Sequence, residues 1–345
     1  MWGKDIGIDL GTATVLIFIK DKGVVLQEPS VVAMDQNSGR ILAVGDDAKL
    51  MIGKTPGNII PVRPLKDGVI ADYSMTEVML RLFFKKVMRG LERIMRHRVM
   101  ICVPSGATDV ERRAVLEAAL EVGAKEAYLI EEPMSAAIGA GLEIAEPSGN
   151  LIVDIGGGTT DVAVISLGGI VVSKSLRVGG DKFDEAIMRY ARRHFNLAIG
   201  EQTAEDLKVK IGTCFPVGEE LSMDIRGRDL IQGLPRQVTV TSTDVCKAIE
   251  ESINMIIGGI REVLELTPPE LAADIIDRGI ILTGGGALLR GLPELVTSQT
   301  DIETIVADAP MECVVLGTGK SLQTLDKFRE SGTVLSATRR GGRRR

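Results

Sequence analysis

A glycine-rich stretch between two apolar runs constrains the fold of this chain more than any other feature. Residues 151–168 read LIVDIGGGTTDVAVISLG, and the β-branched runs on either side of the glycines predict a β-hairpin. Three glycines leave the turn at residues 156–160 largely without β-carbons, so that successive backbone N–H groups can converge on one anion. The stretch therefore predicts a phosphate-binding turn with threonine hydroxyls at its rim.

An aspartate enters this turn from the end of the first strand. Asp154 lies just before the glycines. A carboxylate repels a phosphate unless a cation lies between them, so Asp154 indicates a Mg²⁺ ion that keeps most of its waters. The alternative is an ordinary glycine-rich hairpin in which the aspartate accepts hydrogen bonds from the turn.

The same arrangement occurs near the N-terminus. Residues 6–19 read IGIDLGTATVLIFI, again a strand, an aspartate, a turn of small residues and a second strand. Moving this segment by 145 positions lays Asp9 on Asp154 and one turn on the other. Two such hairpins predict duplicated halves that face each other across a shared polyphosphate.

Length and composition describe an ordinary globular protein of more than one domain. The 345 residues exceed the usual size of a single core, and 26% of them are charged and 45% apolar. Four widely spaced cysteines without a CxxC pair argue against a zinc site or a disulfide framework and favour a reducing compartment. The net charge of −6 argues against nucleic acid as the main partner. We expect neither a signal peptide nor a membrane span.

Two segments predict smaller lobes. Residues 33–64 are rich in Gly, Pro and Asp and carry only short apolar pieces, which indicates a small lobe inserted into the first domain. A second lobe begins after residue 180. Its predicted elements are a helix capped by Asp181, a short helix capped by Thr203, and two strands within residues 220–242.

A basic segment predicts a membrane contact. Apolar residues recur at helical spacing over residues 76–97, and Ile94 and Met95 lie among charges at the end of this predicted helix. Such a segment fits the surface of an anionic bilayer; the alternative is a solvated helix whose apolar residues are core. The terminal RRGGRRR either strengthens attachment, aids solubility or is an expression scar. The basic residues of the helix end are Lys85, Lys86, Arg89, Arg93, Arg96 and Arg98.

Two adjacent carboxylates follow a predicted strand at residues 127–130. Glu131 and Glu132 stand at its exit, and Pro133 fits the first turn of the following helix. Side chains at the end of a strand are often active-site groups in α/β sheets, and a carboxylate here could orient a water in line with a terminal phosphate. The alternative is that both glutamates stabilise the helix N-terminus through its dipole.

Two later glycine-rich stretches have different meanings. Residues 284–286 follow the strand GIILT and open a helix with room for a ribose or a flat ring; a strand-to-helix turn without a ligand is the alternative. Residues 317–321, GTGKS, look like the end of a Walker A loop, but Val314 stands where that loop needs glycine. We expect these residues to begin the last helix.

Together these motifs resemble a known superfamily. The Asp9 turn, the Glu132 junction, the Asp154 turn and the Gly284 turn follow the order of the phosphate 1, connect 1, phosphate 2 and adenosine motifs of the actin, sugar-kinase and heat-shock-chaperone ATPases. More narrowly, DIGIDLGTA, IEEPMSAAIGAG, VDIGGGTTDVAVISLG and LTGGGALLRGL resemble the bacterial actins of the MreB/Mbl family. The resemblance covers nearly all of residues 3–328.

The resemblance implies an α/β, actin-like ATPase fold, with two duplicated ribonuclease-H-like halves and four subdomains around a nucleotide cleft. It implies subdomain IA at residues 1–31, 66–143 and 314–335, IB at 32–65, IIA at 144–180 and 250–313, and IIB at 181–249. Residues 336–345 would then be an arginine-rich tail, which we expect to be disordered.

The resemblance also implies roles for individual residues. Asp9 and Asp154 would hold Mg²⁺ through water, and Glu132 would position the attacking water, with Glu131 as the weaker candidate and Asp161 assisting. The residues implied to bind ATP or ADP are Gly11, Thr12, Ala13, Thr14, Gly156, Gly157, Gly158, Thr159, Thr160, Gly180, Glu205, Lys208, Gly284, Gly285, Gly286 and Ala287.

The function implied is that of a cytoskeletal filament. Protomers would add head to tail into paired filaments on the inner face of the cell membrane and guide cell-wall synthesis together with membrane-spanning elongation proteins. Slow ATP hydrolysis would act as a timer for the polymer. The alternatives are a plasmid-segregating filament and a small-molecule kinase of the same superfamily. A chaperone-like ATPase would need an additional substrate-binding domain.

Overall fold

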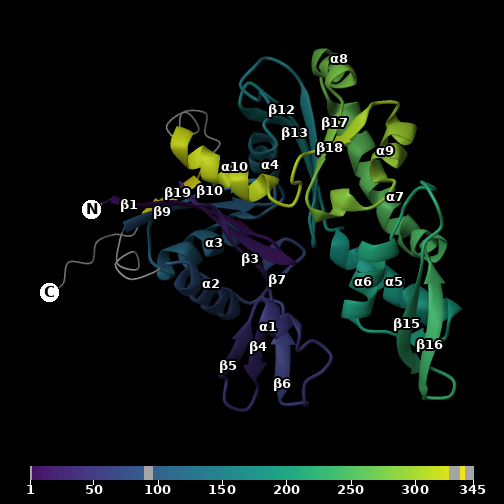
Figure 1. Cartoon of the computed structure of the whole chain (residues 1–345). Helices are drawn as coiled ribbons and strands as arrows, with labels where there is room; N and C mark the ends of the chain where they lie inside the picture. The colour runs from purple at the N-terminus through teal and green to yellow at the C-terminus, as the bar shows by residue number, and fades with distance from the viewer. Residues whose placement is uncertain (1, 89–95, 326–334, 339–345) are drawn as a thin grey trace.

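The structure is a computed structural model that describes residues 2–88, 96–325 and 335–338, and it is organised around two mixed β-sheets (Figure 1). The first sheet has six strands in the order β19-β10-β9-β1-β2-β3. Its strands are β1 (Trp2–Leu10), β2 (Thr14–Ile19), β3 (Gly23–Pro29), β9 (Arg96–Val103), β10 (Ala124–Glu131) and β19 (Leu335–Thr338).

The second sheet repeats the order of the first. It runs β13-β12-β11-β17-β18, and in both sheets an antiparallel meander of three strands continues into two parallel strands. The register repeats as well, because the pairs Leu10–Val15 and Ile155–Thr160 are related by the same shift of 145 positions. The predicted duplication is confirmed. The strands are β11 (Asn150–Ile155), β12 (Thr160–Ser166), β13 (Gly169–Leu176), β17 (Ile280–Thr283) and β18 (Thr304–Val306).

Two helices lie between the sheets and join the halves. These are α4 (Glu132–Gly139) and α10 (Cys313–Ser321), and they share one buried cluster with Met100 of the first sheet and Ile152 of the second. Their backbones touch, since a β-carbon at Gly317 would lie 1.8 Å from the carbonyl oxygen of Ser135. Glycine is therefore required here by close approach rather than by a phosphate.

Helices also cover the outer faces of the two sheets. Residues of α2 (Tyr73–Val87) and α3 (Asp109–Glu121) pack with β1 and β9 in one core. The second sheet has its own core with α7 (Ser242–Leu266), α8 (Pro269–Arg278) and α9 (Leu292–Thr300). The neighbours of Asp9 in β1, Ile8 and Leu10, belong to the outer core, so Asp9 faces inward. Asp154 lies between two outer-core residues of β11 in the same way.

Two smaller lobes lie on one side of the sheets, at the bottom of Figure 1. The predicted lobe near residues 33–64 contains β4 (Val32–Asp35), β5 (Ile41–Val44), α1 (Asp46–Lys49) and β6 (Ile59–Val62), followed by the short pair β7 (Leu65–Lys66) and β8 (Val69–Ile70). The second lobe contains α5 (Gly180–His194), β14 (Leu197–Ala198), α6 (Glu201–Ile211), β15 (Ser222–Asp229) and β16 (Pro235–Thr241). The boundaries of the four subdomains stay a prediction.

The predicted helix over residues 76–97 is wrong at its C-terminal end. Helix α2 ends at Val87, Met88 is extended, and Arg96 and His97 already belong to β9. Helical spacing of apolar residues continued past the true end, but β9 pairs with both β1 and β10, and this ladder fixes its residues as a strand. Ile94 and Met95, the predicted membrane residues, lie outside the described residues.

Both helix caps predicted in the second lobe are also wrong. Gly179, not Asp181, caps α5, because the backbone N–H groups of Gly180 and Asp181 donate to carbonyl oxygens of the second glycine turn. Helix α6 begins at Glu201 after Gly200, two residues before the predicted cap Thr203 is reached. In both cases the N-cap residue is a glycine, and no side chain caps the helix.

Two predictions near the C-terminus need correction. The GTGKS segment is the C-terminal half of α10 rather than the start of a helix. Residues 336–338, which we expected in a disordered tail, belong to β19 and pair with β10. The remaining tail, residues 339–345, lies outside the described residues. The part of the chain that the structure describes contains no helix long and apolar enough to cross a membrane.

Candidate functional site

The two glycine turns meet directly where the halves face each other. A β-carbon at Gly157 would lie 2.5 Å from the β-carbon of Ala13, and one at Gly158 would lie 2.5 Å from Thr12 Oγ1. The hydroxyl oxygen of Thr12 accepts a hydrogen bond from the backbone N–H of Gly68 at 2.9 Å. Side chains larger than hydrogen would therefore push the two turns apart. The sequence prediction that the turns face each other agrees with this contact.

An aspartate stands beside each turn. Asp154 is 5% exposed, and Asp9 is half-buried. Burial raises the pKa of Asp9 to about 6 and that of Asp154 to about 7, and repulsion by Asp9 adds to the increase at Asp154. Asp9 therefore disfavours the charge of Asp154, which faces it from the opposite half, and a bound cation would relieve that cost.

Two further carboxylates complete an acidic cluster. Burial, followed by repulsion from Asp161, Asp154 and Asp9, raises the pKa of Glu132 well above its ordinary value. Burial raises the pKa of Asp161 to about 7. The backbone N–H of Ser105 donates to Asp161 Oδ1 at 3.0 Å, whereas Oδ2 has no hydrogen-bond partner among the described residues. This orphaned acceptor is suited to a water molecule.

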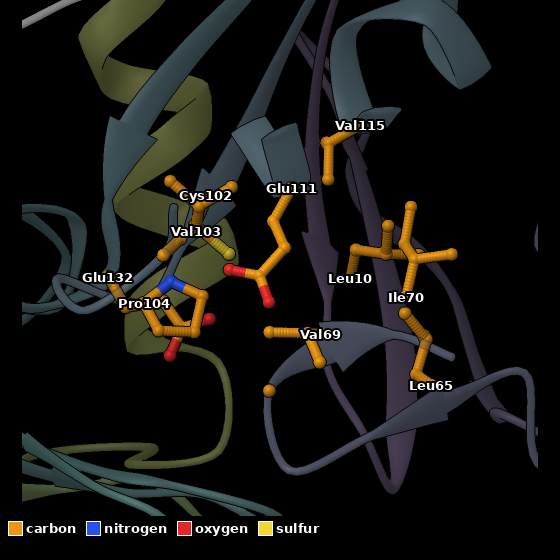
Figure 2. A pocket seen from close by; sticks show the side chains of 12 residues that line it. Leu10, Leu65, Val69, Ile70, Cys102, Val103, Pro104, Glu111, Val115 and Glu132 are labelled. Atoms are coloured by element: carbon orange, nitrogen blue, oxygen red, sulfur yellow. The ribbon is translucent and has the colours of Figure 1, made fainter. Parts of the chain in front are cut away.

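A small cavity of about 20 Å³ adjoins Glu132, and Figure 2 shows Glu132, Glu111 and Cys102 around it. Its other lining residues are mostly apolar. This volume is enough for about one water molecule and far too small for a nucleotide. Glu132 therefore has a neighbouring space in which a water can be held.

Glu131, the second glutamate of the pair, lies in a different environment. Its carboxylate forms an ion pair with Arg112 in α3, with 3.0 Å between Oε1 and Nη2. It makes no side-chain cap for α4. The structure therefore separates the two glutamates, and Glu132 alone belongs to the acidic cluster.

The threonines of the second turn differ in what they can offer a ligand. The hydroxyl of Thr160 donates to the carbonyl oxygen of Val178 at 2.7 Å inside the protein, so it is not a donor at the rim of the turn. Thr159 is also buried, and its side chain lies against Gly68. Backbone groups and Thr14 of the first turn, which is half-buried, are thus better placed than Thr160 to supply a phosphate site.

The predicted ribose and adenine residues of the second lobe bind other protein groups in this structure. Lys208 Nζ pairs with Asp184 at 2.8 Å and donates to the carbonyl oxygen of Gly180 at 3.1 Å. Glu205 pairs with Lys49 in the first lobe at 2.7 Å. The Gly180 N–H in turn donates to Gly156 at 3.0 Å, which connects α6 to the second turn through α5.

The third glycine turn, residues 284–286, packs against β11. A β-carbon at Gly284 would lie 2.8 Å from Asp154 Oδ1, and one at Gly286 would lie 2.2 Å from the side chain of Ile155. Gly285 faces open space, and Ala287 is buried in the core. Only the middle glycine therefore presents bare backbone outward, while its neighbours are small because β11 lies so close.

Sequence reasoning missed the residues that contact the acids. Cys102 donates to Asp9, Thr283 donates to Asp154, and Ser105 donates to Asp161. These residues could have been predicted from their position at the carboxyl ends of strands, which is the criterion that selected Glu131 and Glu132. The 145-residue repeat does not include them, because the segments that carry them differ in length between the two halves.

The donor set fits a hydrated Mg²⁺. Among the described residues, no group of three or more His, Cys, Asp or Glu side chains could hold a metal ion directly. Mg²⁺ commonly keeps several waters and binds one or two carboxylates plus phosphates. Asp9 and Asp154 beside two bare turns match that pattern.

Two sheets of repeated strand order, joined by paired central helices and carrying facing glycine turns, define the class of actin-like proteins. Comparisons with known proteins agree. A family model described as MreB/Mbl protein matches residues 3–330. The chain therefore belongs to the MreB/Mbl family, and it is a cell shape-determining bacterial actin.

The relatives are similar over nearly their full lengths. The chain is 56% identical to the cell shape-determining protein Mbl of Bacillus subtilis over 329 residues, which cover 95% of the chain and 98% of the relative. It is 52% identical to the cell shape-determining protein MreB of Escherichia coli K12 over 330 residues, covering 94% and 95%.

Solved structures give the same result. MreB5 of Spiroplasma citri bound to AMPPNP matches with a TM-score of 0.90 and 41% identity, covering 96% of this chain and 99% of that one. The MamK double helical filament matches with a TM-score of 0.77 and 24% identity, covering 93% and 98%, which is a likeness of fold.

Proposed function

We propose that this chain is an ATP-dependent actin that forms filaments on the inner face of the cell membrane and guides cell-wall synthesis. One observation carries the proposal: two bare glycine turns meet between duplicated halves, and each has an inward-facing aspartate beside it. The likeness to MreB5 structures bound to AMPPNP and ADP supports a nucleotide as the ligand.

In the proposed site, the turns at residues 11–14 and 156–160 bind the phosphates from opposite sides. Asp9 and Asp154 hold Mg²⁺ through water, and the ion neutralises phosphate charge when it is bound. The chain's own backbone N–H groups orient the phosphates. Gly285 provides the open surface for the nucleoside.

Hydrolysis requires a water aligned with the terminal phosphate. We assign this positioning to Glu132, which borders the cavity of about 20 Å³, with Asp161 Oδ2 as a second acceptor. The raised pKa values of both acids favour sharing of a proton with that water. A slow reaction of this kind serves as a timer, because the polymer changes only after phosphate is lost.

Ion pairs connect the lobes at the far side of the site. Lys49 pairs with Glu205 at 2.7 Å, and Arg63 pairs with Glu201 at 3.3 Å. Both pairs join α6 to the first lobe. A nucleotide that bridges the two turns would also hold the halves together, so the nucleotide and the ion pairs both favour the closed arrangement. The closed arrangement would then favour a head-to-tail contact between protomers, and an interface that does not close into a ring gives an open filament.

The membrane part of the proposal concerns the basic segment that begins in the last turn of α2 and continues after it. Its predicted inserting residues are Ile94 and Met95, which follow Lys85 and Lys86 along the chain. Arginine and lysine attract anionic headgroups, and an adjacent apolar pair can enter the acyl boundary. Partner recognition by membrane-spanning elongation proteins is part of the same proposal.

Electron microscopy on an anionic lipid monolayer tests the proposal. We expect paired filaments on the monolayer with ATP and Mg²⁺ and none when the nucleotide is omitted. A variant with both Ile94→Ser and Met95→Ser should still form filaments in solution but should no longer sediment with anionic liposomes. Filaments that form equally without nucleotide would contradict the ATP switch, and unchanged liposome binding of the variant would contradict the membrane assignment alone.

A further inference from the structure

Each of the two facing aspartates receives one side-chain hydrogen bond from the neighbouring parallel strand. Cys102 Sγ in β9 donates to Asp9 Oδ1 at 3.4 Å. Thr283 Oγ1 in β17 donates to Asp154 Oδ1 at 2.9 Å. The same relation therefore occurs once in each half of the molecule.

The sheet topology makes the two donors equivalent. β11 pairs in parallel with β17, with Asp154 opposite Thr283. β1 pairs in parallel with β9, with Ile8 opposite Ile101, so the next position brings Cys102 beside Asp9. Cys102 lies 93 residues from Asp9 along the chain, whereas Thr283 lies 129 residues from Asp154. The equivalent positions of the two donors therefore come from the fold and not from the sequence repeat.

A hydrogen bond at this place affects how the carboxylate can bind a cation. A carboxylate that binds through water must present an oxygen in a fixed direction, and neighbouring donors commonly provide that orientation. The donor occupies Oδ1 in both halves, which restricts rotation of the group and keeps Oδ2 for other partners. Neither donor belongs to the turns at residues 11–14 and 156–160 that are proposed to bind the phosphates.

We propose that Cys102 and Thr283 are positioning residues that orient Asp9 and Asp154 toward one hydrated Mg²⁺. The inference rests on the proposed nucleotide site. It adds that the donor to the aspartate differs between the halves, a thiol in one and a hydroxyl in the other. A hydroxyl is a stronger donor than a thiol. Asp154 is therefore the firmly held ligand, and Asp9 is the one that adapts when the halves move.

Calorimetric titration of ADP at a series of Mg²⁺ concentrations tests this inference. Thr283→Val should raise the Mg²⁺ concentration for half-maximal tightening of ADP binding by about 10- to 100-fold, whereas Thr283→Ser should stay within about 3-fold of the unmodified protein. Cys102→Ala should raise it by about 3- to 10-fold because the thiol is the weaker donor, and Cys102→Ser should restore it. ADP affinity in EDTA should not change in any variant.

Two results would overturn the inference. One is a normal Mg²⁺ dependence in Thr283→Val; the other is an equal loss of ADP affinity with and without Mg²⁺, which a purely structural role would produce. If Thr283→Val does not fold, the Cys102 variants decide the question by the same criterion. An unmodified protein that binds no ADP at any Mg²⁺ concentration would overturn the proposed function as well.

Discussion

Four carboxylates lie together where the halves meet, and their environments differ in ways that assign separate roles. Asp9 and Asp154 each accept one side-chain hydrogen bond and face the turns. Glu132 borders a cavity, and Asp161 keeps one oxygen without a hydrogen-bond partner among the described residues. Glu131, which lies outside this cluster, forms an ion pair with Arg112. Chemistry at the residue scale thus depends on small differences in partner and burial.

Glutamate substitutions test this division. Glu132→Gln should lower the rate of ATP hydrolysis by about 10²- to 10³-fold, because an amide cannot take a proton from the attacking water as a carboxylate can, and should leave ATP affinity nearly unchanged. Glu131→Gln is the matched control and should keep most of the activity. A phosphate-release assay gives both rates. The assignment is wrong if the Glu131 variant is the inactive one.

The pKa of Asp154, raised to about 7, predicts how stability depends on pH. Between its ordinary value near 4 and about 7, the native nucleotide-free protein binds more protons at this site than the unfolded chain. Stability must therefore fall as the pH rises through this window. Asp154→Asn removes this pH dependence. The free energy of unfolding of the variant, relative to that of the unmodified protein, should therefore increase by about 1–3 kcal/mol between pH 5 and pH 8.

Chemical denaturation in EDTA at the two pH values measures this difference. The variant should also lose Mg²⁺-dependent nucleotide binding, so that a gain in stability accompanies a loss of function. An advantage that is the same at both pH values would show that Asp154 does not keep its proton in the native protein.

At the scale of elements, the contact between α4 and α10 explains why the GTGKS segment contains glycine: the segment packs against α4 and is not a phosphate loop. Gly317→Ala would place a β-carbon 1.8 Å from a carbonyl oxygen of α4. We expect this change to destabilise the protein by about 3 kcal/mol, because neither backbone can move without separating the halves. Lys320→Ala changes an exposed end of the same helix and should leave stability and nucleotide affinity nearly unchanged.

Thermal denaturation and ADP titration of both variants check this prediction. Loss of nucleotide binding in Lys320→Ala, with normal stability, would mean that the segment is a phosphate loop after all.

The sequence allowed the two hairpins to be predicted because their signal is local: strand, aspartate, glycine turn and strand repeat with one register. It failed at the start of β9, since the helical spacing of apolar residues before Arg96 continues across the true end of α2. It also failed at Asp181, where the backbone of the second turn caps α5. Cys102 and Thr283 escaped notice because only the paired strands bring them to equivalent places.

At the scale of the whole molecule, two ion pairs join the lobes and would resist opening of the proposed nucleotide site. A double variant with Lys49→Ala and Arg63→Ala should release ADP about 2- to 10-fold faster, since each partly exposed pair contributes no more than about 1 kcal/mol. Lys210→Ala, which breaks a pair within α6, is the matched control. Stopped-flow release of a fluorescent ADP gives the rates, and added salt should reduce the difference. Equal release rates from the unmodified protein, the double variant and Lys210→Ala would show that these ion pairs do not resist opening.

A crystal structure of this chain with Mg²⁺ and a non-hydrolysable ATP analogue tests the central claim most directly. The account predicts the triphosphate between the turns at residues 11–14 and 156–160, with one Mg²⁺ about 4 Å from a carboxylate oxygen of both Asp9 and Asp154 through shared waters. A triphosphate bound elsewhere, or a metal that approaches only one of the two aspartates, would contradict it.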